Sequence, residues 1–117
     1  MEANRKNIFE KIIDREVEAD IVYEDGLAVA FKDINPVAPK HFLVIPKKKI
    51  KSLQSVSGND LHLLSHIMSV IQKLALQEGL VDEGYRVVTN VGNYGGQTVE
   101  HLHFHVIGGR QLRWPPG

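Results

Sequence analysis

The sequence predicts an α+β fold: a five-stranded antiparallel sheet accompanied by one long and one short helix. Two observations lead to this prediction. Segments with helical and strand-like patterns follow one another in the order helix, three strands, helix, two strands. The strands are clustered, and the first two are joined by Asp25-Gly26, a pair typical of hairpins, which favours an antiparallel sheet over a parallel one. With 117 residues the chain is long enough for one core, so we expect a single domain over residues 1–117.

The first half of the chain is expected to contain the short helix and three strands. Apolar pairs at helical spacing predict the helix, at positions 8–9 and 12–13. Strand-like runs cover residues 20–24, 27–32 and 41–45. In the turn between the first two runs, Asp25 and Gly26 are both expected at positive φ. Two prolines, Pro36 and Pro39, keep the connection to the third run free of regular structure.

The second half is expected to contain the long helix and two further strands. The helix runs from about Leu61 to Gln77, with a cap from Asn59 or Asp60 and an end at Gly79 in the left-handed conformation. Apolar residues at intervals of three or four form its expected core stripe: Leu61, Leu64, Ile67, Met68, Ile71, Leu74 and Ala75. The last two strands are expected over residues 85–90 and 101–107, on either side of a glycine-rich loop at 91–98.

Composition and charge exclude several classes of protein. Fourteen Lys and Arg balance fourteen Asp and Glu, so the chain lacks a basic field and no nucleic-acid partner is expected. There is no cysteine, which excludes a disulfide, a thiolate metal site and a cysteine nucleophile. The apolar runs, such as that at 42–45, are far too short to span a membrane, and residues 1–7 carry no signal-peptide pattern. We therefore expect a cytoplasmic protein with no membrane partner.

Three histidines alternate along the last predicted strand and are the strongest candidates for functional residues in the sequence. Because side chains in a strand alternate, His101, His103 and His105 should share one face while the apolar residues between them face the core. One imidazole could attack a substrate while its neighbours orient it and meet the leaving group. The same row could instead bind a metal, and the three residues alone favour neither chemistry. His62 and His66, one helical turn apart, could also pair on a metal but are expected at the surface.

The glycine-rich loop before the histidines favours transfer chemistry. Its glycines leave backbone N–H groups free to approach an anion, and Gln97 and Thr98 add side-chain hydrogen bonds. A phosphate cradle beside a row of imidazoles indicates phosphoryl or nucleotidyl transfer.

The segment His101-Leu-His-Phe-His-Val-Ile107 resembles the signature of the histidine triad family, in which three histidines alternate with apolar residues. The resemblance extends to separated segments along nearly the whole chain: 8–13, 31–36, 38–39, 41–46, 95–97 and 108–110. The ending Trp114-Pro-Pro-Gly117 is similar to the tail of the histidine triad nucleotide-binding proteins, the phosphoramidase branch of that family.

This resemblance implies a role for each matching residue. His103 would be the nucleophile, His105 would contact the phosphate and the leaving group, His101 would orient the nucleophile, and His41 would support them. Asp33 would bind the ribose hydroxyls. The phosphate would be held by Asn90, Gly96, Gln97 and Thr98, and the purine by an apolar slot of Ile8, Phe9, Ile12, Val17 and Ile34. The family forms two-fold dimers that join two sheets, and Trp114 would reach the site of the partner.

The expected activity is hydrolysis of a purine nucleoside 5′-phosphoramidate to a nucleoside monophosphate and an amine, through a nucleotidyl-histidine intermediate. No metal and no other cofactor is required by this scheme. Two alternatives stay open: a purine nucleotide-binding adaptor protein with incidental turnover, and a hydrolase of dinucleoside polyphosphates.

Overall fold

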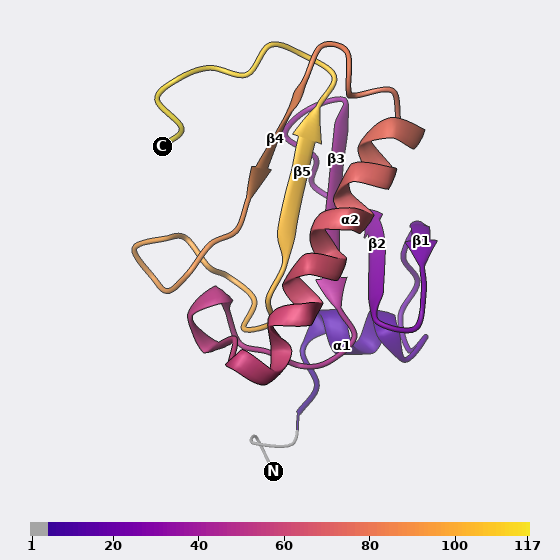
Figure 1. Ribbon diagram of the computed structural model, residues 1–117, viewed down its shortest axis with the longest axis vertical. Helices are drawn as coiled ribbons and strands as arrows, with labels where there is room; N and C mark the ends of the chain where they lie inside the picture. Colours follow the sequence, from indigo (N-terminus) through magenta and orange to yellow (C-terminus); the bar gives the residue numbers. More distant parts are fainter. Residues whose placement is uncertain (1–4) are drawn as a thin grey trace.

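The computed structural model describes residues 5–117; residues 1–4, part of the polar segment 1–7 considered above, lie outside the described residues. The strands are β1 (Ile21–Glu24), β2 (Ala28–Lys32), β3 (Lys40–Pro46), β4 (Tyr85–Val88) and β5 (Phe104–Gly108). They form one sheet in the order β1-β2-β3-β5-β4, with every neighbouring pair antiparallel. The helices are α1 (Ile8–Ile13) and α2 (Leu61–Gln77), preceded by two 3-10 turns, Leu53–Ser55 and Gly58–Asp60. The predicted α+β fold is confirmed (Figure 1).

The two helices cover opposite faces of the sheet. Ala28 and Ala30 of β2 pack with α2, in a core cluster that also contains Phe104 and Val106 of β5. Val29 and Phe31, the alternate residues of β2, pack instead with Phe9 and Ile12 of α1. Because successive side chains in a strand point to opposite faces, both faces of the central strands are buried, and α2 lies along the sheet in Figure 1.

The bounds of α2 are those predicted, and its core stripe is confirmed in part: Ile67, Ile71, Leu74 and Ala75 are buried as expected. Leu61 and Met68, expected in the core, are 57% and 41% exposed. The buried residues are Leu63, Ile67, Val70, Ile71, Leu74 and Ala75. The helix is apolar enough that two neighbouring stripes both satisfy helical spacing, and contact with the sheet selects between them.

The ends of α2 differ in how well the sequence predicted them. Asp60 occupies the N-cap position, but its side chain makes no cap hydrogen bond and instead accepts from Lys48 at 2.9 Å. Gly79 has φ +71, as expected, and the N–H of Leu80 donates to the carbonyl of Ala75 at 2.9 Å. These are features of a Schellman motif, in which glycine is favoured because it lacks a Cβ.

The β1–β2 hairpin forms, but its turn is displaced by one residue from the prediction. The N–H of Asp25 donates to the carbonyl of Ala28 at 3.0 Å, so the two turn residues are Gly26 and Leu27, and neither has positive φ. Asp25 Oδ1 accepts from the N–H groups of Leu27 and Ala28, at 2.8 and 2.9 Å. The aspartate side chain therefore replaces the backbone geometry that an Asp-Gly turn would supply.

Three features complete the fold. His66, expected at the surface, is half-buried and lies 2.6 Å from Asp25 Oδ2, which joins α2 to the hairpin, whereas His62 is exposed as expected. The last strand begins at Phe104, so His101 and His103 precede the regular ladder. Within residues 5–117, no helix combines the length and apolar character that crossing a membrane requires.

Candidate active site

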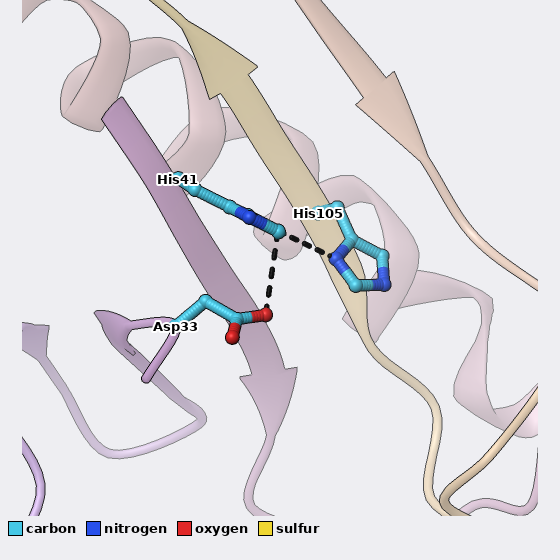
Figure 2. A group of neighbouring side chains, drawn as sticks. All are labelled: Asp33, His41 and His105. Atoms are coloured by element: carbon cyan, nitrogen blue, oxygen red, sulfur yellow. Dashed lines mark hydrogen bonds and ion pairs between the residues drawn. The ribbon is translucent and has the colours of Figure 1, made fainter. Parts of the chain in front are cut away.

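The register of β3 and β5 brings two histidines together. His105 lies opposite Leu43, and His41 lies two residues before Leu43 on the same face of the sheet. Their rings are 5.1 Å apart between centroids, with His41 Nε2 at 2.9 Å from His105 Nδ1. Asp33, in the connection after β2, places Oδ2 at 3.4 Å from the same His41 nitrogen. Figure 2 shows the three side chains converging on one point.

The partners of these rings determine where their protons reside. The main-chain N–H of Val37 donates to His41 Nδ1 at 3.1 Å, so a neutral His41 carries its proton on Nε2. His41 Nε2–H therefore donates to His105 Nδ1, which accepts, and a neutral His105 carries its own proton on Nε2. The pair thus presents an N–H donor at His105 Nε2.

His103 has the opposite arrangement. Its Nδ1 lies 2.7 Å from the carbonyl oxygen of His101, and because a carbonyl only accepts, Nδ1 carries the proton. The lone pair is therefore on Nε2. The ring is buried, with Phe9 against it at a centroid distance of 4.9 Å and His105 at 5.2 Å. A ring nitrogen with a free lone pair thus lies beside a ring that can donate a proton.

His101 is fully buried and contributes to this arrangement through its main chain. Its Nε2–H donates to the carbonyl of Pro46 at 3.0 Å, and Nδ1 faces the Asn7 amide at 3.5 Å. The hydrogen bond with His103 is made by the carbonyl oxygen of His101 and not by its imidazole. Asn7 was not singled out by sequence reasoning, although the pattern Asn7-x-x-Glu10 is a capping-box signal and both hydrogen bonds of that motif form at the start of α1.

Burial favours the neutral forms of His41, His101 and His105. Desolvation lowers the pKa of His41 and of His101, against the opposing effects of Asp33 and of the Pro46 carbonyl respectively. Burial, with smaller contributions from His103 and His41, lowers the pKa of His105 to about 4. Neutral rings at pH 7 agree with the directions of the hydrogen bonds, each of which pairs one donor with one acceptor.

A cleft of about 320 Å³ opens beside His103 and His105, at the small end of the usual range for ligand pockets. Seven of the residues predicted for nucleotide binding line it: Ile8, Phe9, Ile12, Val17, Asp33, Ile34 and Thr98. The apolar members come mainly from α1 and the segment after it. The cleft therefore has an apolar part and an imidazole-lined part, which suits a ligand with a flat ring at one end and a reacting group at the other.

Four of the residues predicted for nucleotide binding lie outside the cleft lining. The Asn90 amide donates to the carbonyl of Gly95 at 2.6 Å. The Gln97 amide accepts from the N–H of Gly92 at 3.0 Å and donates to the carbonyl of Lys51 at 2.7 Å, so both amides are bound to main-chain groups. Gly96 lies in the same loop with φ +79, a conformation that favours glycine. Trp114 is 80% exposed in the C-terminal segment.

Asp33, His41 and His105 also form a possible metal-ligand group, since each offers one ligand atom within 4.8 Å of the others. Two lone pairs would have to face such an ion from His41 Nε2 and His105 Nδ1. The Val37 N–H instead keeps the proton of His41 on Nε2, between the two rings. The donor set therefore fits a hydrogen-bonded pair better than a metal centre.

This fold and this set of buried imidazoles define a histidine triad protein. Residues 14–112 match the HIT domain family, and the chain belongs to that family, as the sequence resemblance indicated. An uncharacterized HIT-like protein of Synechococcus elongatus is 56% identical over 110 residues, covering 94% of this chain and 96% of that protein.

Solved structures agree with the sequence comparison. A HIT family hydrolase from Legionella pneumophila superposes with a TM-score of 0.93 at 48% identity, covering 96% of this chain and 100% of that one. A histidine triad protein from Clostridium difficile superposes with a TM-score of 0.88 at 42% identity, covering 93% and 97%. The chain thus has the fold of HIT family hydrolases.

Proposed function

We propose that this protein hydrolyses purine nucleoside 5′-phosphoramidates through a nucleotidyl-histidine intermediate. The observation that carries the proposal is the complementary protonation of two neighbouring rings. His103 Nε2 holds a lone pair and His105 Nε2 holds a proton, and both residues line one cleft. Attack on phosphorus with loss of an amine needs one group of each kind.

In the first step, the lone pair of His103 Nε2 forms a bond to the α-phosphorus while the P–N bond breaks. The electrons of that bond leave with the amine nitrogen, which takes the proton of His105 Nε2. The hydrogen-bonded pair of His41 and His105 is then one proton short and carries a negative charge. This charge is offset by the positively charged ring of nucleotidyl-His103 beside the pair. In the second step, water attacks phosphorus, returns a proton to His105 and releases His103 with its lone pair restored.

Substrate binding follows from the two parts of the cleft. The purine packs in the apolar part, against Phe9 and Ile12 of α1. Asp33 Oδ1 already accepts from the N–H of Asn35 at 2.8 Å, and its remaining acceptor sites suit the two ribose hydroxyls. The phosphate end of the substrate is assigned to the Thr98 hydroxyl, which lines the cleft at the end of the glycine-rich loop.

The test compares two substrates with purified full-length protein. A fluorogenic adenosine phosphoramidate should be turned over much faster than a dinucleoside polyphosphate, because the P–N nitrogen becomes a good leaving group once protonated. Preference for the polyphosphate would assign the protein to that activity instead. Tight nucleotide binding with no turnover of either substrate would support an adaptor role and contradict the proposal.

We also propose a homodimer. Strand β4 lies at one edge of the sheet, where an unpaired strand exposes main-chain groups that a second copy can satisfy. Val87 on this strand and Trp114 in the tail are exposed apolar side chains. Pairing of two β4 strands would cover this edge and bring each tail toward the cleft of the partner.

A further inference from the structure

We propose that Arg110 is a positioning residue that sets the proton positions of His41 and His105. Arg110 Nη2 donates to the main-chain carbonyl of Val37 at 2.9 Å. The N–H of that same residue donates to His41 Nδ1. A guanidinium outside the cleft is thereby connected, through one residue of the β2–β3 connection, to the ring that orients His105.

The end of β5 is shaped to bring Arg110 to this place. Gly108, the last residue of β5, pairs with Lys40, the first residue of β3. Gly109 then turns with φ +91, and a Cβ added there would lie 3.0 Å from Cβ of Pro39. The chain therefore passes close to the β2–β3 connection just before Arg110, and the left-handed turn needs glycine. Arg110 Nη1 also donates to the carbonyl of Gln111 at 3.1 Å, so the guanidinium is held from both sides.

Val37 depends on the Arg110 contact because its side chain is not packed in the core. Its side chain is 58% exposed, so packing does not anchor the residue. The neighbouring Pro36 and Pro39 have no N–H to donate, which removes main-chain hydrogen bonds from the connection. The Arg110 contact fixes the carbonyl of Val37, and through it the direction of the Val37 N–H toward His41.

Loss of the contact would change the chemistry of His105. Without a donor at Nδ1, His41 can carry its proton there and accept at Nε2. His105 would then donate from Nδ1 and lose the proton on Nε2, which becomes an acceptor. The ring that should protonate the leaving group would instead present a lone pair to it. This consequence for turnover rests on the function proposed above, whereas the proton positions themselves do not.

The proton positions can be measured directly by NMR. We would record long-range ¹H–¹⁵N spectra of the histidine rings in ligand-free, full-length protein. Wild type should show His41 and His105 as Nε2–H forms, and Arg110→Gln should show a mixture of forms for both rings. Lys40→Gln is the matched control: it removes a positive charge next to His41, but Lys40 contacts Glu78 at 2.9 Å rather than Val37. Unchanged histidine spectra in folded Arg110→Gln would overturn the proposal.

Leaving-group dependence gives an independent kinetic readout. An adenosine 5′-phosphoramidate of an alkylamine needs a proton on its leaving group, whereas the 4-nitrophenyl ester of AMP does not. For Arg110→Gln we expect kcat on the phosphoramidate to fall about tenfold or more, with KM within about twofold and little change on the ester. Equal losses on both substrates would indicate a structural role and overturn the proposal.

Two further results keep the test decisive. Arg110→Lys retains the positive charge but not the fork that reaches two carbonyls, so its effects should be intermediate; wild-type behaviour would overturn the proposal, and this variant serves if Arg110→Gln does not fold. If wild-type protein cleaves the ester but not the phosphoramidate, the proposed function is wrong, and the NMR comparison still supports or overturns the role of Arg110.

Discussion

Replacement of His103 by alanine tests the proposed nucleophile most directly. We expect His103→Ala to lose phosphoramidate turnover by about a thousandfold or more, since the covalent route is removed and water has to attack the substrate directly. Nucleotide binding should persist, because the apolar part of the cleft, formed by residues such as Ile12 and Val17, is unaltered.

The cost to stability can be worked out from the contacts of the ring. The substitution removes the 2.7 Å hydrogen bond to the carbonyl of His101, worth about 1 kcal/mol, and leaves that carbonyl without this partner. It also removes the edge contact with Phe9, worth about 0.5–1.5 kcal/mol. A total near 2 kcal/mol is a fraction of the roughly 5–15 kcal/mol that stabilises a typical domain, so the variant should fold.

The assay combines steady-state turnover with detection of the intermediate. Wild-type protein quenched during turnover should gain the mass of one nucleotidyl group on the peptide that contains His103, and the alanine variant should not. His62→Ala provides the control, since this exposed helical histidine lies away from the cleft, and it should retain wild-type turnover. Turnover of His103→Ala within tenfold of wild type would refute the nucleophile assignment.

Four further predictions concern metal, pH, folding and assembly. Turnover should survive exhaustive chelation; chelator-sensitive activity that returns with zinc would contradict the proposed chemistry. The free energy of unfolding should decrease as pH falls from 6.5 toward about 4, because the unfolded chain binds protons that the half-buried His105 does not, and His41 and His101 act in the same direction. Denaturant titrations should show a weaker pH dependence for His105→Gln. Asp25→Ala should lower the free energy of unfolding by about 2 kcal/mol or more without changing kcat, since Asp25 accepts from Tyr23, Leu27 and Ala28 and pairs with His66; a loss below about 0.5 kcal/mol in urea titrations would be inconsistent with this network. Sedimentation should give a dimer of about twice the 13.1 kDa chain mass, and truncation before Trp114 should change kcat/KM without dissociating it; a concentration-independent monomer, or unchanged kinetics, would refute the respective claim.

Local patterns were sufficient to predict much of the fold. The bounds of α2 follow from helical periodicity and from Gly79, which ends the helix through its own left-handed backbone conformation. The alternation of histidines with apolar residues also holds, since Leu102, Phe104 and Val106 are buried in the cluster under α2. Signals of this kind depend on neighbouring residues in the sequence, so they can be read without knowing what each face contacts.

Features that depend on distant partners could not be predicted in this way. Whether Leu61 or Leu63 faces the core depends on where α2 meets the sheet, because both satisfy helical spacing. The amides of Asn90 and Gln97 could hold a phosphate or a loop, and main-chain groups of the loop bond to both: the Gly95 carbonyl to Asn90 and the Gly92 N–H to Gln97. In each case residue type allows several contacts, and tertiary packing selects one.

The sequence by itself thus determined the family, the order of the elements and the presence of three alternating histidines. Only the tertiary structure decided which nitrogen of each ring carries the proton. That choice depends on a donor or acceptor brought from elsewhere in the chain: the Val37 N–H for His41, and the Pro46 carbonyl for His101. An imidazole is the same residue in either form, so its role as acid or base depends on the groups that the sheet places around it.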